Sequence, residues 1–239
     1  AKARVKMKII FYTQLLLNFY AVQSLIPTLS KSALKVPTAL RLFQGFKNPF
    51  SIAAKDTSKD LAIRKSAIED IIALSKGTSN GVKANQDTKS KIEELVKSLE
   101  KLNPTKKITD SPLLDGVWSL VYTTNEGSSA GKIGPFVGEV TQDIRLSESY
   151  YSNNVKLFNG IVQASLGASW DVLSPFLWNV KFLNIKFLLF GNTISAKSLE
   201  GTTGTWRTTY LDETFRILYA IGGKNTVKEN VYILRKLTK

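Results

Sequence analysis

Residues 113–237 carry a succession of short β-type segments, and no stretch between them has helical periodicity. Residues 117–124 are rich in β-branched and aromatic side chains and lie between Asp-Gly and Asn-Glu-Gly turn signals. Asn159-Gly160 is the strongest hairpin signal, because both residues tolerate the positive φ angles of a type I′ turn. Eight to ten such strands in about 125 residues predict a mainly β fold, a closed or nearly closed antiparallel barrel. Further runs of this kind lie at 138–146, 168–173, 179–190, 193–197, 204–211, 215–221 and 230–236.

A helical pattern occupies residues 55–104, ahead of the β region. An Asp-Thr-Ser sequence at 56–58 supplies cap candidates for a first helix, and Gly77 is a natural C-terminal stop. A second helix is expected to begin at Asp87-Thr88 and to end before Pro104. Both segments repeat apolar residues at helical spacing: Leu61, Ile68, Ile71 and Ile72 in the first, and Ile92, Leu95, Val96, Leu99 and Leu102 in the second. The pattern predicts an antiparallel helical hairpin of packing helices.

Residues 1–54 have the composition of a targeting segment, with eight basic residues and no acidic one. A basic stretch ending at Lys8 precedes an apolar run over 9–22, which is shorter than the roughly 20 residues that span a bilayer. Small residues near Ser24 fit a signal-peptidase site, and the acid-free stretch 25–50 fits an organelle transit peptide. We interpret 1–54 as a presequence that is cleaved or disordered, with Met7 as the candidate start. It resembles the bipartite presequence of algae with complex plastids, and an ordinary signal peptide followed by a disordered arm is the alternative.

The chain contains no cysteine and no histidine. Disulfides, thiolate nucleophiles, Cys/His zinc sites and Ser-His-Asp triads are therefore excluded. No phosphate-binding loop, Rossmann fingerprint or Gly-x-Ser-x-Gly motif is present. Asp143, Asp171 and Asp212 are the carboxylates considered for an acid–base pair, and their sequence spacing does not support one. We expect a noncatalytic protein without a cofactor or a metal ion.

The net charge of +14 is concentrated at the front of the chain. Residues 55–239 hold 25 basic and 19 acidic residues, so their net charge is only +6. Lysine far outnumbers arginine in this part, and lysine gives weak phosphate contact with little base readout. We therefore expect no nucleic-acid partner. The lysines of 76–107 are interpreted as a solvated helical face that meets an anionic lipid surface.

Three stretches together resemble one protein family. Residues 92–104 begin with Ile-Glu-Glu-Leu and end with Leu-Asn-Pro, and residues 113–124 read Leu-Leu-Asp-Gly-Val-Trp-Ser-Leu-Val-Tyr-Thr-Thr. Residues 209–217 read Thr-Tyr-Leu-Asp-Glu-Thr-Phe-Arg-Ile, and 231–235 read Val-Tyr-Ile-Leu-Arg. In order and spacing they resemble the plastid lipid-associated proteins, also called plastoglobulins or fibrillins. The resemblance covers 58–236, and 166–201 departs from it most.

The resemblance implies a lipocalin-like barrel that binds apolar plastid lipids such as carotenoids or prenylquinones. It implies a location on thylakoids, on plastoglobules or in the stroma, in contact with a membrane or lipid-droplet surface. An accessory protein that binds and stimulates an enzyme of prenylquinone synthesis is the alternative. A lipid-acting enzyme is a third and more distant reading.

The residues that suit a ligand site are aromatic side chains in the predicted strands, with one polar pair. The alternative for each aromatic residue is plain core, and for the polar pair Asp212–Arg216 it is a structural salt bridge. Strand alternation places Trp118, Leu120 and Tyr122 on one face. The ligand-binding candidates are Tyr122, Phe158, Trp170, Phe182, Phe187, Tyr210, Asp212 and Arg216.

Gly116 and Trp118 form a Gly-x-Trp at the start of the first strand. In lipocalin-like barrels such an indole can close the base of the barrel, where a guanidinium from a late strand covers it by a cation–π contact. Arg235 or Arg216 can supply that guanidinium. We expect Gly116, Trp118 and Arg235 to have this architectural role.

Overall fold

The computed structural model describes residues 58–222 and 229–238, so the predicted presequence lies outside the described residues. The described residues 58–132, 136–222 and 229–238 belong to one compact unit that contains two helices and a barrel. Helix α3 spans Ser58–Ser75 and helix α4 spans Gln86–Lys101. The Asn85 side chain caps α4 by accepting a hydrogen bond of 2.8 Å from the Thr88 amide, so this helix begins slightly earlier than the sequence predicts.

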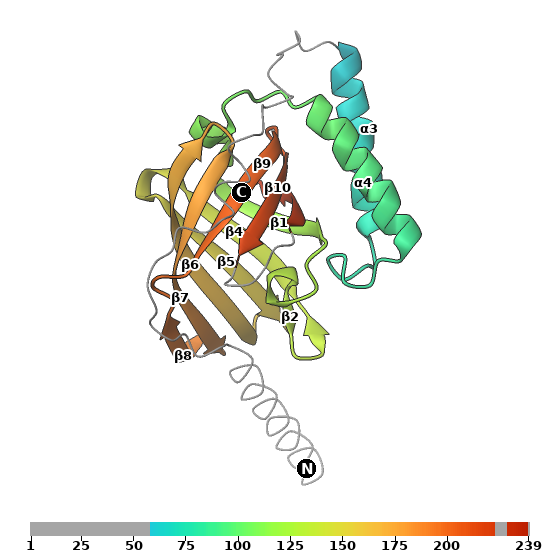
Figure 1. The fold of residues 1–239 in the computed structure, drawn as a ribbon. Coiled ribbons are helices and arrows are strands. Elements are labelled where there is room, and N and C mark those ends of the chain that lie inside the picture. Colours follow the sequence, from blue (N-terminus) through green and yellow to red (C-terminus); the bar gives the residue numbers. More distant parts are fainter. Residues whose placement is uncertain (1–57, 223–228, 239) are drawn as a thin grey trace, which may run out of the picture. The chain divides into compact units, whose positions relative to one another are not determined.

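The β region forms a closed antiparallel barrel, as predicted (Figure 1). Its strand order is β6-β5-β4-β1-β11-β10-β9-β7, and pairing of β6 with β7 closes the ring. Strand β7 has two partners besides β6. Its first half (177–181) pairs with β9, and its second half (184–189) pairs with β8. The strands are β1 Gly116–Thr123, β2 Lys132–Ile133, β3 Phe136–Val137, β4 Glu139–Arg145, β5 Tyr150–Leu157, β6 Val162–Ser174, β7 Leu177–Leu189, β8 Asn192–Ser198, β9 Thr203–Leu211, β10 Phe215–Gly222 and β11 Asn230–Lys236.

The predicted hairpin around Asn159 connects β5 and β6, in which Leu157 pairs with Val162. Phe158 and Asn159 have φ angles of 52° and 55°, and the Gly160 amide donates to the Leu157 carbonyl over 3.0 Å. Gly160 also has a positive φ, of 84°, and the Ile161 amide donates to the Phe158 carbonyl over 3.2 Å. Two overlapping turns therefore centre on Phe158-Asn159 and on the predicted Asn159-Gly160.

A β-bulge separates Trp118 and Leu120 from Tyr122, contrary to the expectation that all three share one face. Leu120 pairs with Leu234, but Tyr122 pairs with Ile233, so Val121 is the extra residue of β1. One extra residue moves every following side chain to the other face of the sheet. Tyr122 therefore leaves the barrel interior and packs on the outside.

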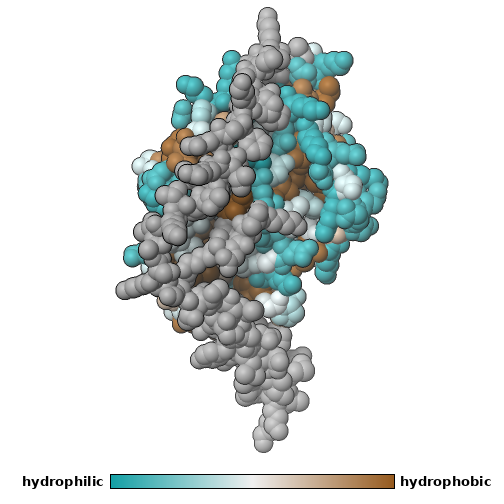
Figure 2. Space-filling model, in the orientation of Figure 1, coloured by the Kyte–Doolittle hydropathy of each residue, from teal (hydrophilic) through white to brown (hydrophobic). Residues whose placement is uncertain are grey.

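Two apolar regions hold the unit together, one inside the barrel and one between the barrel and the helices. The outer region is formed by α3, α4 and the outward faces of β1, β9, β10 and β11 (Figure 1). Hydrophilic side chains cover the exposed side of the helices (Figure 2). Each fully buried aliphatic side chain contributes about 1.5–3 kcal/mol, so this region fixes the hairpin on the barrel. Its buried members are Ala67, Ile71, Ile92, Val96, Leu99, Tyr122, Tyr210, Phe215, Ile217 and Ile233.

None of the helices in the described part of the chain is long and apolar enough to cross a membrane.

Candidate functional site

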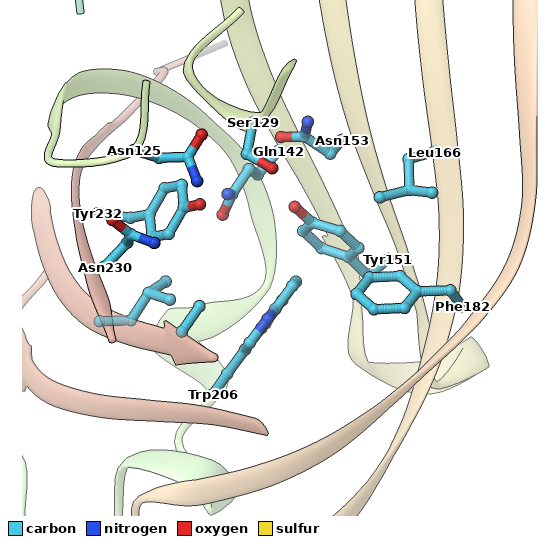
Figure 3. Close-up of a pocket in the computed structure, with 12 residues that line it drawn as sticks. Asn125, Ser129, Gln142, Tyr151, Asn153, Leu166, Phe182, Trp206, Asn230 and Tyr232 are labelled. Carbon is cyan, nitrogen blue, oxygen red and sulfur yellow. The ribbon is translucent and has the colours of Figure 1, made fainter. Parts of the chain in front are cut away.

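A cavity of about 210 Å³ lies inside the barrel (Figure 3). Seven of the eight barrel strands contribute to its wall, so closure of the sheet creates it. The loop that follows β1 completes the wall. The lining residues are Asn125, Ser129, Gln142, Tyr151, Asn153, Leu166, Phe182, Trp206, Leu218, Ala220, Asn230 and Tyr232.

The wall of the cavity is polar on one side and apolar on the other (Figure 3). Amide and hydroxyl groups occupy the polar side, among them those of Gln142, Tyr151 and Tyr232. Side chains such as Phe182 and Trp206 form the apolar side. None of the lining residues carries a formal charge at neutral pH, so the cavity offers hydrogen bonds and apolar contact.

Tyr151 and Trp206 meet edge to face where the two sides of the wall join, with ring centroids 4.5 Å apart and an interplanar angle of 80°. Such contacts are favourable because the positive edge of one ring faces the negative face of the other. Burial raises the pKa of Tyr151 and of Tyr232 above the usual 10.0, and both phenols are protonated at neutral pH. Both hydroxyls therefore remain hydrogen-bond donors.

Trp118 lies near the start of β1 and contacts the short 3₁₀ helix that precedes this strand. Its side chain is fully buried, and its indole N–H donates to the Leu114 carbonyl over 2.9 Å. Leu114 ends a short 3₁₀ helix, Pro112–Leu114, directly before β1. Gly116 joins the two with a φ of 111°, a left-handed conformation that favours glycine.

Two cations lie over the Trp118 ring. The Arg216 guanidinium carbon is 4.9 Å from the ring centroid, and Lys236 Nζ is 5.2 Å from it. Lys236 Nζ also donates to the Leu113 carbonyl over 2.8 Å. Arg235, which we expected in this position, has an exposed side chain.

Arg216 is 1% exposed, and its guanidinium donates a hydrogen bond to Oε1 of Gln142. Its Nε has no hydrogen-bond partner among the described residues. Burial lowers the pKa of Arg216 to about 10, so the guanidinium stays charged at neutral pH. Gln142 also lines the cavity and connects this buried charge to the polar wall.

Of the predicted ligand residues, Phe182 lines the cavity and Arg216 lies behind its polar wall. Tyr122 and Tyr210 belong instead to the outer region beneath the helices. Phe187 is buried in the half of β7 that pairs with β8.

Phe158 and Trp170 also lie away from the cavity wall. Phe158 is 40% exposed in the β5–β6 turn and meets Phe136 edge to face at 5.1 Å. Trp170 stacks on Trp178 with their ring centroids 4.3 Å apart.

Asp212 and Arg216 do not pair with each other in the described part of the chain. The Asp212 carboxylate accepts hydrogen bonds from the Tyr210 hydroxyl and from the Thr214 and Phe215 amides, at 2.5, 2.7 and 2.7 Å. It therefore shapes the β9–β10 turn. Arg216 is the first inward-facing residue after that turn, where it meets Gln142.

Most of the cavity wall lies outside the residues that the sequence predicted, and Gln142, Tyr151, Trp206 and Tyr232 are examples. A signal for Gln142 exists in strand alternation, because Val140, Gln142 and Ile144 share the buried face of β4. A polar side chain between two apolar ones on that face indicates a polar site inside the barrel.

Within the described residues, no group of three or more Asp, Glu, Cys or His side chains is arranged to hold a metal ion.

The sequence matches the model of the PAP_fibrillin family over residues 65–228. A chromoplast-specific carotenoid-associated protein of Cucumis sativus is 28% identical over 151 residues, which cover 58% of this chain and 46% of that protein. Plastid lipid-associated protein 1 of Brassica campestris is 33% identical over 114 residues, covering 44% of this chain and 35% of the relative. Probable plastid-lipid-associated protein 5 of Arabidopsis thaliana is 26% identical over 157 residues, covering 64% of each. The chain thus spans less than half of the first two relatives.

Proposed function

Because the chain belongs to the PAP_fibrillin family, we propose that it is a plastid protein that holds one end of an apolar lipid molecule in its barrel. The cavity is the main support for this proposal, because its apolar wall faces a polar wall without charge. Ligand sites are commonly apolar clefts with a few polar groups that orient the ligand. The proposed role is binding without catalysis, with a carotenoid, prenylquinone or similar plastid lipid as ligand.

The size of the cavity limits how much of the ligand it encloses. Its volume of about 210 Å³ lies below the roughly 300–1,000 Å³ of typical small-molecule pockets. It therefore takes a ring, a head group or the end of a chain, and the rest of the molecule extends outside. Apolar surface that enters gains about 25 cal/mol per Å² removed from water.

We propose that an apolar tip places the barrel on a lipid surface. The turns β5–β6 and β7–β8 are neighbours, because the Phe190 amide donates to the Ile161 carbonyl over 2.8 Å. Four apolar side chains at these turns are exposed, which is unusual for a soluble surface. This apolar tip consists of Phe158 (40% exposed), Ile161 (40%), Phe190 (59%) and Ile194 (50%).

The charges around the apolar tip favour an anionic lipid surface over a protein partner. In residues 149–199 the only acidic residue is Asp171, and its carboxylate pairs with Lys181 at 2.6 Å. Lys156, Lys186 and Lys197 are exposed on the strands that lead to the tip. A basic side chain near an anionic leaflet contributes roughly 1 kcal/mol.

Purification of the protein from its native source, followed by lipid extraction and mass spectrometry, tests the ligand proposal. We expect one apolar lipid class to co-purify in stoichiometric amount. A barrel that is consistently empty and co-purifies with a prenyl-lipid synthase would instead support the accessory role. Turnover of a lipid by the purified protein alone would contradict a noncatalytic role.

Vesicle flotation tests the apolar tip. The double variant Phe158→Ser/Phe190→Ser should lose binding to vesicles of phosphatidylcholine and phosphatidylglycerol, and the wild type should bind less without phosphatidylglycerol. The matched control is Leu61→Ser, because Leu61 is 57% exposed but lies on α3. Equal binding by the double variant and the wild type would contradict the proposal.

We also propose that residues 1–54 direct the protein into a complex plastid. A fluorescent protein fused to 1–54 should enter the plastid of an alga of that type. A fusion that lacks residues 1–24 should remain outside, and plastid entry without them would contradict the bipartite interpretation.

A further inference from the structure

Arg216 carries a positive charge inside the barrel without a counter-ion. No carboxylate among the described residues forms an ion pair with it, and Gln142 is its hydrogen-bond partner. Taking an ion out of water costs several kcal/mol, and that cost is normally offset by an opposite charge. Contact with Trp118 explains the position of the side chain, but a neutral methionine would pack on the indole without the charge.

Gln142 lies between the Arg216 guanidinium and the cavity and contacts both. Because Oε1 of Gln142 accepts from Arg216, the amide N–H groups of the same side chain remain to donate elsewhere. Tyr151, close enough for its phenol and the guanidinium to affect each other's ionisation, lines the cavity as well. The Tyr232 hydroxyl faces the same space (Figure 3). The polar wall thus combines hydrogen-bond donors with an unbalanced positive charge behind them.

We propose that the polar wall binds the carboxylate of a lipid acid, whose chain lies against Phe182, Trp206 and Leu166. This inference rests on the proposed lipid-binding function and names the chemical class of the ligand. In a low-dielectric interior an anion beside the guanidinium is stabilised more strongly than in water. Hydrogen bonds from Gln142 and Tyr151 to a carboxylate are charge-assisted and therefore about twice as strong as neutral ones.

The size and composition of the site favour a carboxylate over a phosphate. The cavity holds about 210 Å³, and its apolar wall begins next to the donors. A small planar anion fits between the donors and leaves room for its chain. Behind these donors, Arg216 supplies the positive charge that contacts the polar wall through Gln142, and one charge matches a monoanionic carboxylate.

The affinities of a fluorescent lipid acid and of its neutral ester for the protein test the inference directly. We would titrate the protein with cis-parinaric acid and with methyl parinarate, following polyene fluorescence at neutral pH. The wild type should bind the acid about tenfold or more tightly than the ester, because a hydrogen bond to a charged group contributes roughly 1.5–3 kcal/mol. Equal affinities would overturn the inference and leave the proposed function intact. Binding of neither probe would contradict the proposed function and the inference with it.

Gln142→Glu is the decisive variant, because it gives Arg216 a permanent counter-ion without removing volume. It should fold and bind the acid no more tightly than the ester. The matched control is Thr141→Glu, which adds the same charge on the neighbouring residue of β4, facing the other side of the sheet. This control should retain the acid preference.

Arg216→Met provides a second route to the same conclusion. It removes the charge and keeps an extended apolar side chain against Trp118. We expect the acid preference to disappear while ester binding persists, with thermal unfolding confirming the fold. An acid preference that survives in both Gln142→Glu and Arg216→Met would overturn the inference.

Discussion

The guanidinium of Arg216 lies 4.9 Å from the centre of the Trp118 indole ring, inside the barrel. Both side chains are buried, with exposures of 1% and 0%. Trp118 joins the base of the barrel to the preceding 3₁₀ helix through Leu114, and Arg216 joins the indole to Gln142 and the cavity wall. One contact therefore connects the start of β1 to the polar side of the cavity.

Replacement of Trp118 by alanine should lower the free energy of unfolding by about 3–5 kcal/mol, because a large cavity opens at the base of the barrel. Urea unfolding followed by circular dichroism measures the change. Trp170→Ala is the control, because Trp170 is only partly buried and stacks on Trp178. A loss for Trp118→Ala no larger than that for the control would contradict the closing role of Trp118.

Asp212→Ala should destabilise the protein by about 2–3 kcal/mol, because the Tyr210 hydroxyl and two amides lose a charged acceptor. Glu213→Ala is the matched control, since its exposed neighbouring side chain carries the same charge. We expect the control to change stability by less than about 0.5 kcal/mol. Thermal unfolding of the two variants gives the comparison. Equal melting temperatures would refute the proposed role of Asp212 in stabilising the β9–β10 turn.

Gly81→Ala should cost about 3 kcal/mol or more. Gly81 has a φ of 100°, and a Cβ atom there would collide with the carbonyl oxygen of Thr123. Gly77 has a φ of 74° but open space around it, so Gly77→Ala should cost only the roughly 1–2 kcal/mol of a left-handed residue. Chemical denaturation of both variants separates the two effects. Equal losses of unfolding free energy would mean that the close contact between Gly81 and Thr123 of β1 does not contribute to stability.

Stability should be nearly constant between about pH 6 and pH 9 and should fall above about pH 10. The chain has no histidine or cysteine to titrate in the neutral range. Burial raises the pKa values of four tyrosines above the usual 10.0: Tyr122, Tyr151, Tyr219 and Tyr232. Their contribution is complete below pH 10 and is lost as pH rises through the folded-state values, because the unfolded chain ionises first.

Arg216 acts in the opposite direction. Its pKa is lowered to about 10 by burial, so rising pH relieves the cost of burying its charge. Lys236, whose pKa is also lowered by burial, acts in the same direction as Arg216. Two such groups oppose four tyrosines, and we therefore expect a net loss. Melting temperatures measured from pH 6 to about pH 12 check the profile, and Tyr151→Phe should reduce the alkaline loss. A melting temperature that rises above pH 10 would contradict this balance.

The helices and the barrel were predictable because each follows from local patterns. Apolar residues recur at helical spacing in 58–101, and short β-rich runs without helices between them leave few architectures other than a barrel. The hairpin around Asn159 was also predictable from its turn residues. The pairing of Leu157 with Val162 leaves a four-residue loop, and the predicted Asn159-Gly160 pair lies at its centre.

The inner and outer faces of the strands could not be predicted at the bulges. Alternation along 116–123 places Tyr122 with Trp118, but the extra residue Val121 turns Tyr122 towards the helices. A second bulge has the same effect on Tyr210. Tyr210 pairs with Ile217 and Thr208 pairs with Leu218, so Thr209 is the extra residue of β9. A bulge is a property of two paired strands, and one strand's sequence does not contain it.

The sequence by itself determined the order of helices and strands, the excluded chemistries and the resemblance to a family. Only the tertiary structure decided which side chains meet inside the barrel. Arg216 and Gln142 are 74 residues apart in the sequence, and their side chains meet because the closed sheet brings β4 and β10 together. Such a contact depends on pairing register and curvature, which arise when the strands assemble and not within any one of them.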